Sequence, residues 1–263
     1  LKSDVDLNIP VSKVKQEKTF AVIIANENYQ EEVNVEFALN DGMAFREYCV
    51  KLLGIPKSNL HIRKDATLNN MLAEINWMQN IAKAYGAEAR FIFYYAGHGM
   101  PDESNGTSYL LPVDGKSNIL ATGYSMSRLY AELNGLNAAC VTVLMDACFS
   151  GSKRGEGMLA SARGVALKAK AEAPKGNMLV MTAAQGSETA YPYKEKKHGL
   201  FTYFLLKKLQ ESKGKVTYGD LFDYVKTNVA QKSVVVNEKS QTPTIAVSGD
   251  LVSTWQGIRL NED

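Results

Sequence analysis

The stretch Val141-Thr-Val-Leu-Met-Asp146-Ala-Cys148-Phe-Ser-Gly151 changes from apolar to polar halfway along its length. Residues 141–145 form a short, largely β-branched run, which is typical of a strand buried on both faces of a sheet. The polar residues that follow stand at the carboxyl end of that strand, where open α/β sheets bind their ligands. The stretch therefore predicts an α/β fold with the thiol of Cys148 at a ligand-binding edge. Most free cysteines are small core residues, so the thiol alone favours a structural role.

A second apolar run ends in a histidine. Arg90-Phe-Ile-Phe-Tyr-Tyr-Ala96 is also typical of a buried strand, and Gly97-His98-Gly99 follows it. The two glycines let the backbone approach a ligand closely. His98 precedes Cys148 by 148 − 98 = 50 residues. This spacing agrees with the caspase signature, in which a histidine lies about 50 residues upstream of the nucleophile.

Together, Tyr94-Tyr-Ala-Gly-His-Gly99 and Asp146-Ala-Cys-Phe-Ser-Gly151 resemble the caspase-like cysteine peptidases, in particular the metacaspase, paracaspase and bacterial branch. The resemblance runs from about residue 20 to about residue 247 and includes Phe37-Ala-Leu-Asn-Asp41 and His198-Gly-Leu-Phe-Thr202. It implies a caspase-like α/β/α sandwich with a mostly parallel central sheet flanked by helices. The β-α-β-α-β pattern of the first 96 residues predicts the same kind of sheet.

The expected chemistry is that of a thiolate nucleophile. A nearby imidazole can take the thiol proton or stabilise the ion pair, so Cys148 and His98 are predicted to form a catalytic dyad. The alternative is a structural cysteine and histidine. The resemblance implies that a backbone carbonyl, rather than a carboxylate, orients the imidazole. It also implies that the N–H groups of Gly99 and Cys148 hold the oxyanion.

Asp146 predicts the substrate preference. Residues two apart in an extended segment point the same way, so Asp146 is expected to face the cleft that Cys148 faces. A buried carboxylate is costly without a cation, and an Arg or Lys side chain of a substrate would supply one. The metacaspase motif carries an aspartate at this position, whereas caspases proper use Gln-Ala-Cys-Arg-Gly to receive aspartate. We therefore expect peptide or protein substrates that are cleaved after Arg or Lys.

Further residues complete the predicted pocket. Asp41 is expected to be its second carboxylate, mainly on the strength of the resemblance. The alternative is a helix N-cap, because an apolar-periodic run from Met43 to Leu53 follows it. Gln185, Ser187 and Glu188 are placed at the far rim, where a solvated loop is nearly as good an explanation.

The segment 152–175 is rich in Lys and Arg and follows the nucleophile directly. A peptidase with a basic preference is expected to cut itself there; the alternative is a charged linker that only increases solubility. The candidate self-cleavage residues are Lys153, Arg154, Arg163, Lys168 and Lys170. The chain is thus expected to be one caspase-like domain with a lead-in (1–18), a large-subunit-like part (19–151), this linker, and a small-subunit-like part (176–263).

Composition sets the remaining bounds. The net charge of +2 gives no case for nucleic-acid binding, and no apolar run approaches the roughly 18 residues of a membrane span. Three cysteines without metal-binding spacing predict neither a disulfide framework nor a zinc site, so no cofactor is expected.

Three questions stay open at this stage. Asp102, Glu103 and Asp114 are candidates for calcium, but they do not align with a metacaspase calcium site. The chain begins at Leu1 rather than Met, which leaves a removed signal peptide, and therefore the compartment, undecided. The main alternative function is a catalytically silent caspase-like interaction or signalling module, and a different thiol hydrolase or transferase is the other.

Overall fold

Six strands form the central sheet of the computed structural model, in the order β11-β8-β7-β3-β1-β2. The structure describes residues 2–102, 104, 106–147, 149, 174–186 and 188–261. All neighbouring strands are parallel except β11, which pairs antiparallel with β8. The strands are β1 (Thr19–Ala25), β2 (Leu60–Lys64), β3 (Arg90–Ala96), β7 (Cys140–Asp146), β8 (Met178–Thr182) and β11 (Thr244–Val247).

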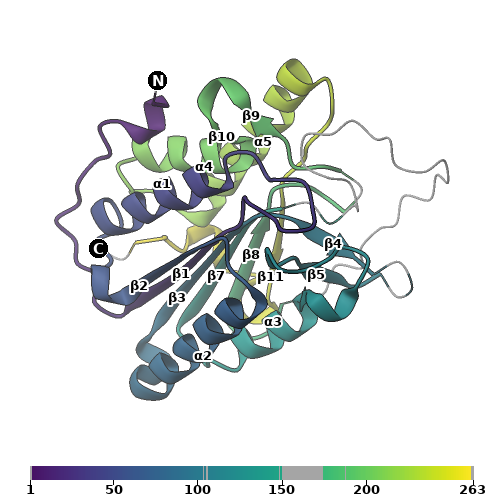
Figure 1. The fold of residues 1–263 in the computed structure, drawn as a ribbon. Coiled ribbons are helices and arrows are strands. Elements are labelled where there is room, and N and C mark those ends of the chain that lie inside the picture. The colour runs from purple at the N-terminus through teal and green to yellow at the C-terminus, as the bar shows by residue number, and fades with distance from the viewer. Residues whose placement is uncertain are drawn as a thin grey trace.

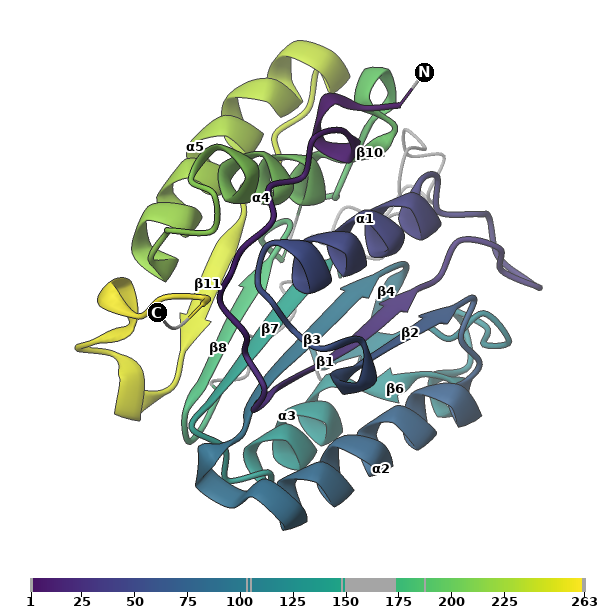
Figure 2. The same ribbon diagram turned by 90° about the vertical axis from the view of Figure 1, so that its left-hand side faces the viewer.

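Helices cover both faces of this sheet, as Figures 1 and 2 show. One face carries α1 (Ala38–Lys51), α4 (Leu200–Glu211) and α5 (Tyr218–Asn237), and the other carries α2 (Leu68–Tyr85) and α3 (Met126–Asn134). Alternate residues of a strand pack against opposite helix layers: Tyr94 lies in the core with α1, α4 and α5, and Phe93 lies in the core with α2 and α3. The predicted α/β/α sandwich with a mostly parallel sheet is confirmed.

Two smaller sheets and several short helices complete the described part of the chain. The small sheets are β4 (Gly99–Pro101), β5 (Ser108–Leu110) and β6 (Tyr124–Ser125), and β9 (Pro192–Tyr193) with β10 (His198–Gly199). The 3-10 turns are η1 (Asp4–Asp6), η2 (Lys57–Asn59), η3 (Gly86–Glu88), η4 (Leu120–Thr122), η5 (Lys194–Lys196), η6 (Gly249–Leu251) and η7 (Trp255–Gly257). None of the helices among these residues is long and apolar enough to cross a membrane.

Helix α1 begins five residues earlier than the apolar pattern predicted. Its N-cap is Phe37, a residue with a left-handed backbone (φ 69°) and no capping side chain. The Glu27 carboxylate, from the loop after β1, accepts the N–H of Leu39 at 2.9 Å and so replaces a local cap. Because the cap comes from ten residues upstream, the usual Ser, Thr, Asp or Asn signal is missing. Asp41 therefore lies inside the first turn of α1.

The lead-in packs against the domain through its first turn, η1. Val5 is wholly buried, and its carbonyl accepts the hydroxyl proton of Tyr48 at 2.8 Å. Asp4 accepts a hydrogen bond from Tyr203 and one from Lys207, both on α4. Figures 1 and 2 show this segment lying beside α4. The lead-in thus contacts both α1 and α4.

Candidate active site

The two sequence motifs follow neighbouring strands that end at the same level. Strands β3 and β7 pair in parallel with Ala96 opposite Asp146, and the N–H of Gly97 donates to the Asp146 carbonyl at 3.3 Å. His98 lies two residues beyond Ala96, and Cys148 is two residues beyond Asp146 in the sequence. Cys148 itself lies outside the described residues.

Other predicted residues are also outside the described part of the chain. They are Ser187 of the pocket rim and the self-cleavage candidates Lys153, Arg154, Arg163, Lys168 and Lys170. Their predicted roles are therefore still sequence predictions.

A backbone carbonyl orients His98. Its Nε2 lies 2.8 Å from the carbonyl oxygen of Val33. Because a carbonyl can only accept, Nε2 carries a proton, and Nδ1 is the basic nitrogen of the neutral ring. The imidazole is almost fully buried and packs on the ring of Tyr29, with 4.7 Å between ring centroids. The Tyr29 hydroxyl accepts the backbone N–H of His98 at 2.8 Å. This geometry fixes both the ring and the backbone of the histidine.

The loop that carries Val33 is itself tied down. One oxygen of Asp65 accepts the N–H groups of Glu27 and Asn28, each at 2.9 Å. The Asn34 side chain accepts the N–H of Tyr29 at 3.3 Å. Neither Val33 nor Asp65 carries a recognisable sequence signal, because Val33 acts through its main chain and Asp65 acts on another loop.

Glycine is required at position 97 for steric reasons. A Cβ there would lie 2.7 Å from the hydroxyl oxygens of both Tyr29 and Tyr95. The Tyr95 hydroxyl donates to the His98 carbonyl at 2.7 Å, so these tyrosines hold the turn between β3 and β4. Gly99, the predicted oxyanion residue, is the first residue of β4.

Asp146 is wholly buried at the end of β7. Its Oδ2 accepts two hydrogen bonds from Thr202, one from the backbone N–H at 3.1 Å and one from the hydroxyl at 2.7 Å. The hydroxyl of Tyr94 lies 2.7 Å from the Thr202 hydroxyl and extends this network. We expected Asp146 to face a cleft. The structure encloses its carboxylate, Thr202 satisfies Oδ2, and the role of Asp146 in substrate binding stays a prediction.

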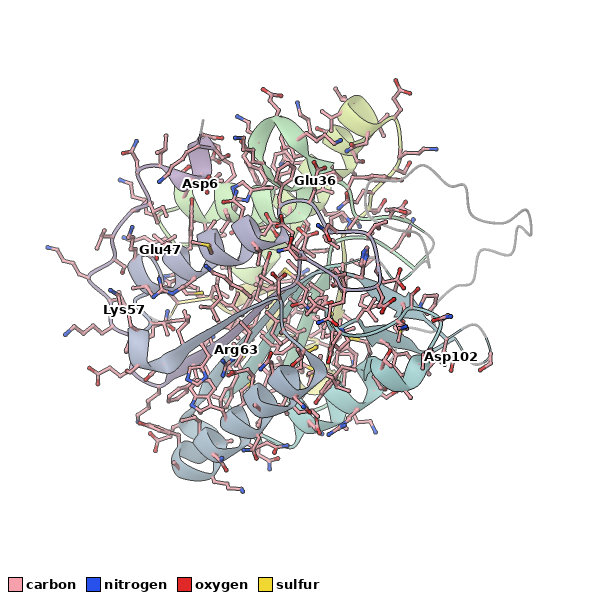
Figure 3. The ribbon with its side chains drawn as sticks, viewed as in Figure 1. Asp6, Glu36, Glu47, Lys57, Arg63 and Asp102 are labelled. Carbon is pink, nitrogen blue, oxygen red and sulfur yellow. The ribbon has the colours of Figure 1, made fainter. Side chains whose placement is uncertain are left out.

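Asp41 is also wholly buried, and the alternative that it caps a helix is wrong because Phe37 is the N-cap. Its Oδ1 lies 2.8 Å from Nδ1 of His198, and the N–H of Gly199 donates to both carboxylate oxygens at 3.1 Å. The other ring nitrogen of His198 lies 3.1 Å from Oδ1 of Asp6. Figure 3 shows Asp6 on the N-terminal turn, beside α4.

His198 is charged at neutral pH in this setting. Burial would lower its pKa, but hydrogen bonds to Asp41 and Asp6 and their negative charges outweigh burial and raise the pKa to about 9. The sequence predicts a loop residue at His198, because it precedes Gly199 and a helical run. The ring instead lies on β10, wholly buried between two carboxylates.

The predicted rim residues are tied to another loop. Gln185 is exposed and donates to Glu188 at 2.8 Å, and Glu188 accepts the hydroxyl proton of Thr242 at 3.1 Å. These contacts fix the loop after β8. In the described part of the chain, these contacts join Gln185 and Glu188 to each other and to Thr242, whereas Asp41 and Asp146 contact His198 and Thr202.

The calcium candidates lie in different settings. Asp102 accepts hydrogen bonds from Ser104, at 2.9 Å from its N–H and 2.6 Å from its hydroxyl, within its own loop (Figure 3). Asp114 accepts the N–H of Leu68 at 3.0 Å, at the start of α2. Glu103 is outside the described residues. Among those that are described, no three His, Cys, Asp or Glu side chains form a group that could hold a metal ion.

Comparison with solved structures places this fold among caspases. The crystal structure of Caspase-1 from Spodoptera frugiperda superposes with a TM-score of 0.62 at 14% identity, covering 92% of each chain. A protein from Geobacter sulfurreducens superposes with the same TM-score of 0.62 at 18% identity, covering 88% of this chain and 93% of that one. Likeness at such identities shows the fold alone. A search of curated proteins found no match.

The sequence model of the caspase-domain family, peptidase C14, matches residues 18–250, and the chain belongs to this family. The resemblance to caspase-like peptidases that the sequence motifs predicted is therefore confirmed. At the level of the family, the protein is a caspase-like cysteine peptidase, and its substrates are proteins.

Proposed function

We propose that the protein is a cysteine endopeptidase that cleaves after Arg or Lys, with Cys148 as nucleophile and His98 as its base. The observation that carries the proposal is the register of β3 and β7, which sets Ala96 opposite Asp146. In the sequence, His98 and Cys148 each come two residues after this pair, so the two motifs leave neighbouring strands at the same height of the sheet. The carbonyl of Val33 supports the same conclusion, because it leaves Nδ1 of His98 as the basic nitrogen.

The proposed reaction needs only these groups and two N–H donors. Nδ1 of His98 takes the proton of the Cys148 thiol, and the thiolate attacks the carbonyl carbon of the scissile bond. The N–H groups of Gly99 and Cys148 hold the oxyanion. The protonated Nδ1 then donates its proton to the leaving amine, and water hydrolyses the acyl-enzyme. We propose that turnover needs no metal, so activity should persist in a chelator such as EGTA.

The preference for a basic residue rests on Asp146 and Asp41. Both carboxylates are wholly buried, and both contact the segment 198–202, Asp146 through Thr202 and Asp41 through His198 and Gly199. A pair of acids in the substrate pocket would favour a cationic side chain and disfavour an anionic one. Gln185, Ser187 and Glu188 are proposed only as the outer rim of this pocket.

A panel of peptides with Arg, Lys or Asp before the scissile bond tests the proposal. The wild-type protein should cleave the Arg and Lys peptides, and Cys148→Ala should cleave none. Asp146→Asn keeps the shape of the side chain but removes its charge. It should lose about 100-fold in kcat/KM for Arg peptides, the loss expected for a charged hydrogen-bonding group. Alkylation of Cys148 by iodoacetamide should stay near the wild-type rate in this variant.

Two results would redirect the proposal. Cleavage after Asp would refute the acidic pocket while leaving the peptidase in place. Cleavage of no peptide, together with an unreactive Cys148, would favour a catalytically silent interaction or signalling module.

We also propose self-cleavage in the segment 152–175, on the basis of its sequence alone. Lys153, Arg154, Arg163, Lys168 and Lys170 are the candidate sites. Intact-mass spectrometry of the parent beside Cys148→Ala should find cut chains only in the parent. Equal intact masses after long incubation would remove this idea.

A further inference from the structure

One short segment contacts both of the buried acids. His198 and Gly199, which form β10, hold Asp41, and Thr202 in the first turn of α4 holds Asp146. The N–H groups of Gly199 and Thr202 point at carboxylate oxygens 3.1 Å away. The start of a helix carries partial positive charge, and the backbone at the start of α4 therefore presents that charge to both acids.

The side chain of His198 adds a cation that two acids share. Its Nδ1 faces Asp41 of α1 at 2.8 Å, and its Nε2 faces Asp6 of η1 at 3.1 Å. The formal charge of this trio is −1 + 1 − 1 = −1, so one negative charge is left over. Asp4, which lies two residues before Asp6, pairs with Lys196 at 3.1 Å and with Lys207 at 3.0 Å, and Lys207 also pairs with Glu211 at 3.7 Å. The amide nitrogen of Asn40 on α1 lies 3.4 Å from Nε2 but donates to the Lys197 carbonyl, at 2.7 Å.

We propose that His198 is a positioning residue for substrate specificity, holding the Asp41 carboxylate in the orientation in which it meets the basic side chain of a substrate. This inference rests on the proposed function, because it requires Asp41 to line the substrate pocket. The geometry explains why a histidine serves here. Its two nitrogens bridge α1 and the lead-in, and a carboxylate gripped by an imidazole and a backbone N–H has little freedom to rotate.

Two substitutions of His198 by an amide side chain test the two contacts of the ring separately. In His198→Asn, the side-chain amide nitrogen reaches the position of Nδ1 and can still donate to Asp41. In His198→Gln, the longer side chain carries its amide nitrogen to the position of Nε2, next to Asp6, and leaves Asp41 without this donor. Both variants are neutral and polar, so the loss of charge is common to them.

The expected result is a split between KM and kcat. His198→Gln should raise KM for Arg peptides about 10-fold, as expected for a lost hydrogen bond to a charged group, with kcat within about 3-fold of wild type. His198→Asn should keep KM within about 3-fold of wild type, and neither variant should change alkylation of Cys148. His61→Gln is the control. His61 lies on β2, and its ring also pairs with a buried carboxylate, that of Glu74, at 2.6 Å. Because this pair involves neither Asp41 nor Asp146, replacing His61 should leave KM unchanged.

Equal KM values for His198→Asn and His198→Gln would overturn the inference, as would an equal rise of KM in His61→Gln. Asp41→Asn, measured in the same series, separates this failure from that of the proposed function. If Asp41→Asn leaves KM for Arg peptides unchanged, the acidic pocket itself is wrong. If Asp41→Asn raises KM while the two His198 variants agree, only the role of His198 is wrong.

Discussion

Raising the pH should weaken this fold through the buried imidazole of His198. The pKa of this group rises from 6.5 to about 9 on folding, against the effect of burial, because Asp41 and Asp6 flank it. A group whose pKa is raised in the folded state contributes stability that is fully present below pH 6.5 and is lost as the pH rises through about 9. At 1.36 kcal/mol for each unit, the contribution is about 3 kcal/mol.

The measurement is thermal unfolding between pH 6 and 10 in a Cys148→Ala background, which excludes the proposed self-cleavage. Other groups titrate over this range, so the quantity to compare is the difference in melting temperature between this protein and its His198→Asn variant. For a chain of this size, about 3 kcal/mol corresponds to a difference of about 5–10 °C that is present at pH 6 and disappears by pH 10. A constant part of the difference, from lost packing, is expected to remain at every pH.

Asp6→Asn provides the internal control. It removes one of the two anions beside His198, so the pKa of the imidazole should fall and the loss of stability should begin at a lower pH. A difference between the parent and His198→Asn that does not vary between pH 6 and 10 would refute the reasoning, because the ring would then carry no charge that folding stabilises.

Two more substitutions test contacts on either side of the site. Gly97→Ala should force Tyr29 and Tyr95 apart, because its Cβ would lie 2.7 Å from both hydroxyls; we expect a loss of about 1–3 kcal/mol in stability and a clear fall in kcat, and a wild-type kcat would contradict the role given to Tyr29. Val5→Ala should lower the free energy of unfolding by about 2 kcal/mol, since the side chain is wholly buried, while kcat stays unchanged. A melting temperature equal to that of the parent would mean that the lead-in does not dock.

The sheet could be predicted from the sequence because its strands are continuous apolar runs. The predicted strand Arg90–Ala96 agrees with β3 to the residue, and the predicted run 141–145 lies within β7 with one more residue at each end. Such runs are buried on both faces, so they depend little on their neighbours for recognition. Helix α1 was predicted less well, because Glu27 supplies its cap from another loop.

The surroundings of the site could not be predicted in the same way. The link between His198 and Asp41 spans 157 positions in the sequence, and no local pattern encodes it. The contact of His98 with Val33 involves a carbonyl that every residue possesses. Periodicity and motifs identify side chains that act at a strand end. They do not identify main-chain partners, or a buried charge whose counter-ions come from other elements.

The arrangement of these contacts bears on the proposed self-cleavage. The segment 152–175 separates β7 from β8, yet these strands pair in parallel from Val141 opposite Met178 to Met145 opposite Thr182. The two acids lie before this segment, and the residues that hold them, His198 and Thr202, lie after it. A cut between them would leave every one of these contacts in place, because none of them runs through the segment. The proposed self-cleavage would then cut the segment that follows the proposed nucleophile in the sequence without separating the two pieces. Any change of activity on cutting should therefore come from that segment and not from a loosened pocket.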